Sequence, residues 1–137
     1  MEKSFAQMTF AAFLSVLAYY AGIMAVPVTV LIFLMALDYL TGLAGAYINK
    51  ELSSRQGVRG IIKKLCYLGA VAAAAASDWA LAAAGLSSVY DNGCSAAIMV
   101  AMWLIINELI SILENLSRIG IPLPEKLLEL IKRLKYK

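Results

Sequence analysis

Residues 28–37 read VTVLIFLMAL, a run without any charged or strongly polar side chain, inside an apolar block that covers residues 26–48. A similar run, IMVAMWLII at residues 98–106, lies in a second apolar block over residues 96–116. A helix needs about 20 mainly apolar residues to cross a bilayer, and a helix of a soluble bundle would show a polar face. Both blocks are long enough, and neither central run has such a face. The two blocks therefore predict an integral membrane protein.

Two further apolar blocks extend this pattern. Residues 61–85 include AVAAAAASDWALAAAG, whose alanines drive insertion only weakly, so this span should depend on close packing against its neighbours. Residues 5–21 are short for a span, and their stripe of small and polar residues suits either a packed span, which we favour, or a helix lying in the membrane interface. Gly22 and Pro27 predict a break after this block, with Pro27 in the first turn of the next helix. The expected fold class is all-α, with three or four transmembrane helices and a C-terminal basic amphipathic helix.

The composition agrees with one membrane domain over residues 1–137 and argues against other classes. The chain is 62% apolar and 15% charged, whereas a soluble domain is roughly half apolar and a quarter charged. A net charge of +3 is too small to indicate nucleic-acid binding. The chain has two cysteines and no histidine, and it contains neither metal-ligand spacing nor a nucleophile with its base. We expect no enzyme activity and no cofactor.

Basic residues are concentrated in two segments, which predicts an orientation. Residues 49–64, NKELSSRQGVRGIIKK, are expected to form a basic loop, in which Gly57 and Gly60 indicate a turn. Its basic side chains are Lys50, Arg55, Arg59, Lys63 and Lys64. Residues 86–95, between the third and fourth blocks, contain none. Because Lys and Arg bias a loop toward the cytoplasm, the basic loop and the C-terminus should lie on the cytoplasmic side.

The second basic segment is the tail over residues 120–137. Its last part, EKLLELIKRLKYK, spaces apolar residues as on one face of a helix and fills the other positions largely with basic ones. Such a helix suits a bilayer with anionic head groups, although an amphipathic helix packed on another protein face has the same pattern. The side chains expected at the lipid surface are Lys126, Lys132, Arg133 and Lys135.

Acidic residues lie inside the predicted spans. Asp38 and Glu108 fall near the middle of their blocks, and Asp78 lies in the outer part of the third. An acid at the centre of a span costs about 2.5–3.5 kcal/mol, so such residues line a pore, relay protons or ions, or make structural hydrogen bonds. The candidates for assembly or pore lining are Asp38, Gly42, Asp78, Asn107, Glu108 and Glu114. The acids have no expected basic partner within the spans, which argues against fixed ion pairs inside the membrane.

Several strings occur in a familiar order: DYLTG from Asp38, LSSRQGVRGIIKK from Leu52, Asp78 itself, and NELISILENLSRIGIPLP from Asn107. Together they resemble the bacteriophage holin family of the toxin-secretion and phage-lysis type, over residues 30–130. The family features fall on Asp38, Gly42, Ser53, Ser54, Gly57, Gly60, Lys63, Lys64, Asp78, Glu108, Ser111, Glu114, Asn115, Gly120, Pro122 and Pro124.

The resemblance implies a function in the cytoplasmic membrane of a bacterial host. Holins of this kind form homo-oligomers and open lesions that release an endolysin or a toxin, without necessary direct contact with that cargo. Two other functions remain open from the residues alone. One is a small proton-coupled transporter that uses Asp38 or Glu108, and the other is an antiholin-like regulatory membrane protein.

The predicted orientation can be tested at the C-terminus. A cysteine introduced next to Lys137 should resist a membrane-impermeant thiol reagent added to intact cells and react once the membrane is opened. Labelling of that cysteine in intact cells would contradict the whole topology.

Overall fold

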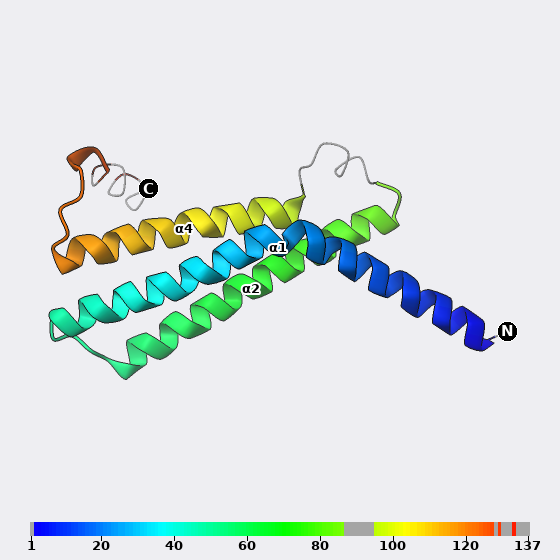
Figure 1. Ribbon diagram of the computed structural model, residues 1–137, viewed down its shortest axis with the longest axis horizontal. Coiled ribbons are helices and arrows are strands. Elements are labelled where there is room, and N and C mark those ends of the chain that lie inside the picture. Colours follow the sequence, from blue (N-terminus) through cyan, green and yellow to red (C-terminus); the bar gives the residue numbers. More distant parts are fainter. Residues whose placement is uncertain (1, 87–94, 128, 130–132, 134–137) are drawn as a thin grey trace.

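The computed structural model describes residues 2–86, 95–127, 129 and 133, most of which belong to three long helices. Helix α1 covers Glu2–Ile48, α2 covers Ser54–Ala83 and α4 covers Ala96–Ile119. This part of the chain contains no strand. Figure 1 shows the three helices running side by side, with the N-terminal part of α1 projecting beyond the others.

Three helical segments are long and apolar enough to cross a membrane. They are Gly22–Ile48, Ser54–Ala83 and Ala96–Ile119, with 27, 30 and 24 residues. At about 1.5 Å per residue these segments are about 36–45 Å long, more than the hydrocarbon core of about 30 Å. The predicted all-α membrane fold is confirmed.

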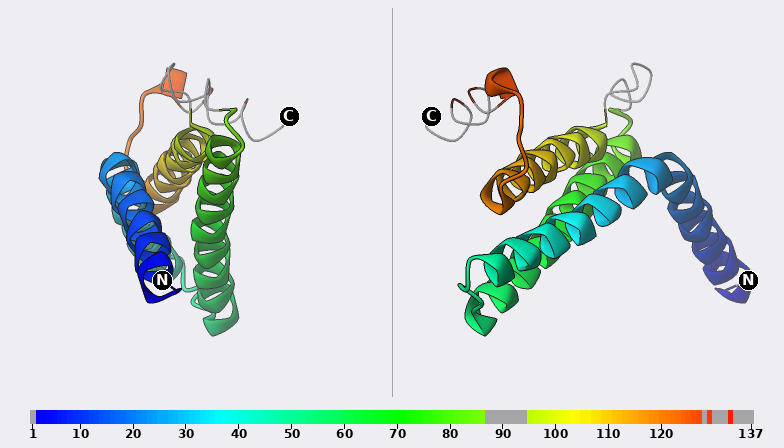
Figure 2. Two further views of the ribbon diagram at one scale, coloured as in Figure 1. Left: turned by 90° about the vertical axis from the view of Figure 1, so that its right-hand side faces the viewer. Right: turned by 60° about the vertical axis from the view of Figure 1, so that its left-hand side comes forward.

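Helix α1 differs from the expectation of two separate helices over residues 5–21 and 26–48. The structure has one continuous helix, Glu2–Ile48, with Pro27 inside it. Proline removes one backbone hydrogen bond and crowds the preceding turn, so it bends a long apolar helix without ending it. Figure 2 shows such a bend in the first half of α1, after which the helix joins the bundle. The prediction of a helix break between Gly22 and Pro27 was wrong.

The expected basic loop over residues 49–64 is mostly helix. Helix α2 begins at Ser54 after the N-cap Ser53, so only residues 49–53 connect it to α1. The backbone N–H groups of Gln56 and Gly57 bond to the Ser53 carbonyl and start the first turn. Gly57 and Gly60 suggested a turn, but they lie inside this helix, so the loop prediction was wrong for residues 54–64.

Helix α4 holds the bundle together. It packs along both α1 and α2, whereas α1 and α2 contact each other only slightly. The buried core consists of Met24, Leu31, Leu34, Met35, Val71, Ala97, Ala101, Leu104, Ile105 and Ile112. Ala97 and Ala101 are fully buried, which brings the α4 backbone close to its neighbours. The core is narrow, and many large apolar side chains outside it are exposed, among them Phe33, Leu65 and Trp103. Such an apolar exterior suits lipid rather than water.

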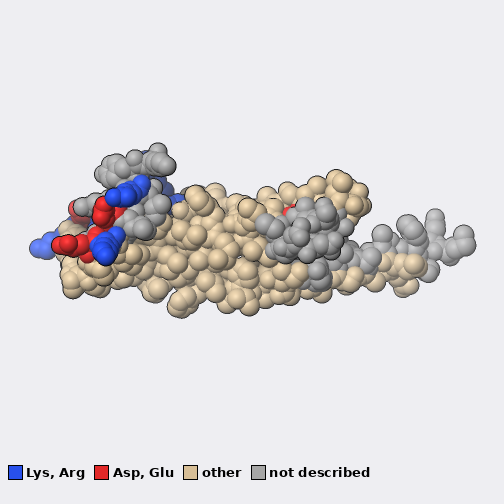
Figure 3. Space-filling view, turned by 90° about the horizontal axis from the view of Figure 1, so that it is seen from above, with Lys and Arg blue, Asp and Glu red and all other residues tan. Residues whose placement is uncertain are grey.

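Charged side chains gather at one end of the bundle. The connection between α1 and α2 lies there, together with the C-terminal end of α4, as Figures 1 and 3 show. Helix α4 ends at Gly120, whose φ of 94° is the left-handed conformation that glycine adopts most easily. The two basic segments thus start from the same end, as the hairpin of the third and fourth blocks predicted.

Gly42 of α1 lies against the Asn115 side chain of α4 near this end. A Cβ atom at Gly42 would lie 3.4 Å from the Asn115 amide nitrogen, whereas a Cβ at Gly69 of α2 would meet nothing within 4 Å. A side chain larger than a methyl group therefore meets Asn115 at position 42 but meets open space at position 69.

We expect Gly42→Leu to lower the melting temperature of the detergent-solubilised protein, because the added side chain must separate α1 from α4. Gly69→Leu should leave it unchanged or raise it, since leucine favours helix more than glycine does. Circular dichroism on both variants measures the difference. Equal melting temperatures would contradict the close approach at Gly42.

Candidate functional site

A partly buried triad of charged side chains joins the three helices. The Lys64 ammonium of α2 lies 2.8 Å from an Asp38 carboxylate oxygen of α1 and 2.5 Å from a Glu108 carboxylate oxygen of α4. The side chains of Lys64 and Asp38 are 15% and 16% exposed, and that of Glu108 is 4% exposed. Each helix contributes one charge, so a single ammonium connects all three.

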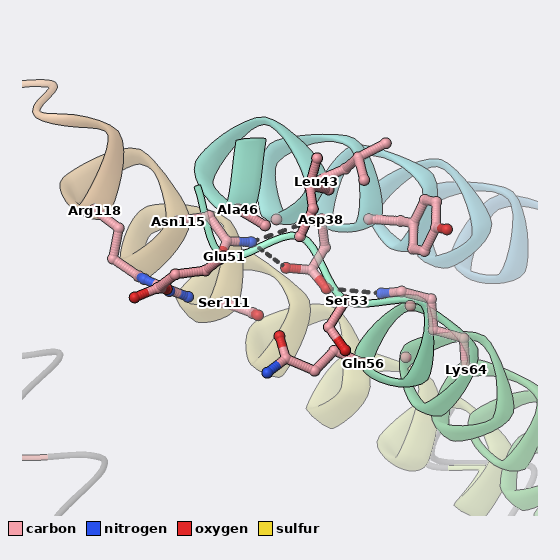
Figure 4. A pocket seen from close by; sticks show the side chains of 15 residues that line it. Asp38, Leu43, Ala46, Glu51, Ser53, Gln56, Lys64, Ser111, Asn115 and Arg118 are labelled. Atoms are coloured by element: carbon pink, nitrogen blue, oxygen red, sulfur yellow. Dashed lines mark hydrogen bonds and ion pairs between the residues drawn. The ribbon is translucent and has the colours of Figure 1, made fainter. Parts of the chain in front are cut away.

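Asp38 is held from a second side by Asn115 of α4. The Asn115 amide donates to the other Asp38 carboxylate oxygen at 2.9 Å and to the Asp38 backbone carbonyl at 3.2 Å. It also reaches the Thr41 hydroxyl, which itself donates to α1 carbonyls one turn earlier. Figure 4 shows Asn115 and Lys64 approaching Asp38 from two different helices. These bonds fix the carboxylate in one orientation toward Lys64.

The triad corrects the expectation that the acids lack basic partners. Lys64 was assigned to the basic loop, but the early start of α2 places it on a helix between Asp38 and Glu108. An ammonium shared by two carboxylates lowers the cost of placing all three charges away from water. The triad still carries one formal negative charge in excess.

Two polar hollows adjoin the triad. The first, of about 250 Å³, extends from Glu51 and Arg118 at the charged end to Asp38 and Lys64. The second, of about 330 Å³, is lined by Lys63, Tyr67, Asn107, Glu108, Ile110, Ser111 and Glu114. Within the described ranges no group of His, Cys, Asp and Glu is arranged to hold a metal ion.

Asp78 has a different role at the opposite end of the bundle. It is 1% exposed and accepts hydrogen bonds from the Ser95 hydroxyl and from the backbone N–H groups of Ala96 and Ala97. The first backbone N–H groups of a helix have no acceptor within the helix itself, and Asp78 supplies one for Ala96 and Ala97. The helix dipole also favours a negative charge at this end of α4. Asp78 therefore caps α4 from α2 and closes the hairpin between these helices.

The other residues that the sequence analysis singled out lie beside one of the two hollows, on the exposed surface, or outside the described residues. Asn107 and Glu114 lie half-buried beside the second hollow, and Gly42 packs on Asn115. Arg55, Arg59 and Lys63 are exposed on the first turns of α2, and Lys126 and Arg133 are exposed in the tail. Lys132 and Lys135 lie outside the described residues, as does most of the predicted amphipathic helix.

The sequence contained a signal for the role of Lys64. Arg55, Arg59 and Lys63 recur every four residues and form one exposed face of a helix. Gly57, Gly60 and Lys64 follow the i, i+3, i+7 spacing on the opposite face, which packs inward. Two faces at helical spacing are typical of a helix, and this pattern would have moved Lys64 from a loop into the bundle.

Comparison with known proteins agrees with this architecture. The family profile described as "Bacteriophage holin family" matches residues 15–136, which include all of the triad and both hollows. The chain belongs to the bacteriophage holin family. The resemblance noted in the sequence is thereby confirmed, and so is the expectation that the chain is not an enzyme, since holins are membrane pore-formers.

Similar proteins occur in several bacteria. An "Uncharacterized 14.9 kDa protein in nagH 3'region" of Clostridium perfringens is 38% identical over 117 residues, covering 85% of this chain and 82% of the relative. Uncharacterized proteins of Halalkalibacterium halodurans and Listeria innocua are 35% and 37% identical, over 83% and 85% of this chain and 82% and 77% of the relatives. No solved structure matches the chain.

The triad makes a stability prediction for this holin. Lys64→Met should lower the free energy of unfolding by about 2 kcal/mol, because two carboxylates then face each other without a cation in a partly buried site. Lys63→Met is the matched control, since the neighbouring Lys63 is exposed and only lies 5.5 Å over the Tyr67 ring. That change should cost about 0.5 kcal/mol or less. Denaturant unfolding in detergent measures both, and equal losses would contradict a structural role of Lys64.

Proposed function

We propose that the chain is a holin that oligomerises in the bacterial cytoplasmic membrane and opens lesions through which an endolysin or a toxin leaves the cytoplasm. The observation that carries this proposal is the holin-family match over residues 15–136 on a chain with three span-length helices. The cargo passes through the lesion and needs no direct contact with the protein.

The surface of α2 supports assembly of several copies. Gly69, Ala72, Ala73, Ala76 and Ala80 are all exposed, so one flank of this helix carries almost no side-chain bulk. Helices associate in lipid mainly through close backbone approach at small residues. A second copy can therefore pack on α2 without disturbing the contacts that α4 makes.

The triad supports a protomer that is stable in lipid before assembly. Lys64 offsets one of the two negative charges of Asp38 and Glu108, so a single bundle resides in the bilayer at lower cost than it would without this cation. In the assembled state the same polar residues, with Asn107 and Glu114, would face water and line the lesion. Asp78 serves as the structural cap of α4 in both states.

We further propose three spans with the charged end in the cytoplasm. The exposed basic residues of α2 and of the tail then lie at the anionic inner leaflet, where each contributes about 1 kcal/mol. The C-terminus is cytoplasmic, and the N-terminal arm of α1 lies on the outer side.

Conditional expression tests the proposed function. Expression in bacteria should collapse the membrane potential abruptly after a delay, and lysis should follow when a cytoplasmic endolysin is present. The same strain without endolysin should lose its potential yet lyse far more slowly.

The outcome separates this function from its alternatives. Normal growth at high membrane levels would overturn the effector function, and delayed lysis by another holin would then indicate an antiholin. A tight membrane with substrate flux that stops on Asp38→Asn would indicate a transporter.

A further inference from the structure

We propose that each protomer contains a water-filled vestibule that opens at the charged end of the bundle and admits small cations in preference to anions. The vestibule is a property of the single protomer, so it does not depend on oligomerisation or on lesion formation.

The first hollow provides the mouth of the vestibule. Glu51, Leu52 and Ser53 of the α1–α2 connection line it together with Arg118, and it ends at Asp38 and Lys64. Figure 4 shows polar side chains from all three helices around this space. The hollow therefore leads from the charged end to the triad.

The second hollow extends the polar path further along α4. Ser111 lines both hollows, and Asn107 lies one helical turn deeper. From Arg118 to Asn107 the residues that line the two hollows extend along α4 for about 16 Å, at about 1.5 Å per residue. The Lys64–Glu108 ion pair lies between the two hollows, because Lys64 lines the first and Glu108 lines the second.

Size and polarity favour water in this path. A water molecule occupies about 30 Å³ in the liquid and needs two to four polar partners, so each hollow has room for several waters. Hydroxyl, amide and charged groups line both spaces. Polar walls at this depth without water would be costly in a bilayer, and water entering from the charged end removes that cost.

The charges along the path favour cations. Both hollows together are lined by the acidic residues Asp38, Glu51, Glu108 and Glu114 and by the basic residues Lys63, Lys64 and Arg118. The acids exceed the bases by one, and the excess lies at the triad, where low-dielectric walls strengthen the field. Small cations and water are therefore the expected occupants.

Thiol accessibility tests the vestibule directly. In a chain with Cys66→Ser and Cys94→Ser, Ser111→Cys should react with a membrane-impermeant cationic methanethiosulfonate, because thiolate forms only where water reaches it. Leu109→Cys is the matched control, since Leu109 is exposed on the apolar surface of the same helix, two residues away. Right-side-out and inverted vesicles, prepared below lytic expression, expose either end to the reagent.

We expect Ser111→Cys to react about tenfold faster than Leu109→Cys, and from one membrane side only. Equal rates, or labelling from both sides, would overturn the vestibule. Asn107→Cys with Ile106→Cys as its control repeats the test one turn deeper, and it decides the proposal if Ser111→Cys fails to insert.

The charge of the reagent tests the preference for cations. After division by their rates on a free thiol, the cationic reagent should modify Ser111→Cys about threefold faster than an anionic methanethiosulfonate. Equal or reversed ratios would overturn the preference for cations.

Discussion

The Lys64 ammonium shared by Asp38 and Glu108 is the interaction on which the arrangement of the three helices depends. Helices α1 and α2 contact each other only slightly, so their relative position is set through α4 and through this one cation. In lipid the hydrophobic effect does not drive helices together, and packing of small residues with polar contacts takes its place. Ala97 and Ala101 supply close packing in the half of the bundle away from the charged end, and the triad supplies the polar contact near that end.

Two sets of polar contacts hold α2 and α4 together at different positions along their length. Asp78 caps the start of α4, and Lys64 binds Glu108 farther along the same pair of helices. Between them the contacts are apolar, with Val71 and Leu104 in the core. This arrangement fixes the register of the two helices, because sliding by one turn would separate Asp78 from the start of α4 and Lys64 from Glu108.

The sequence was sufficient to predict a helical membrane protein and to place both basic segments at one end. It also singled out Asp38, Asp78 and Glu108, the acids that make the polar contacts between the helices. It was insufficient for helix boundaries, since Gly22, Pro27, Gly57 and Gly60 were interpreted as break or turn residues although all four lie inside helices. A glycine inside a helix costs only about 1 kcal/mol relative to alanine, and helices that span membranes tolerate proline. The partner of Asp38 was missed because Lys64 was assigned to the predicted loop 49–64, although this residue also falls at the start of the predicted span 61–85. Asn115 and Ser95 were not predictable as partners, since their bonds join positions far apart in the chain.

In the proposed holin function, an acid pair that shares one cation meets two requirements. Under that proposal the protomer first resides in lipid without damaging the membrane, and the proposed assembly later presents polar groups to water. Lys64 meets the first requirement, and the hollows on either side of it mean that little of α4 has to move to meet the second.

A double-mutant cycle between Lys64→Met and Glu108→Gln tests the shared ammonium most directly. We predict that the two losses in unfolding free energy differ from additivity by about 1 kcal/mol or more, as for residues in contact, whereas Lys63→Met with Glu108→Gln should be additive. Additive losses for Lys64 and Glu108 would contradict a bundle organised around this cation.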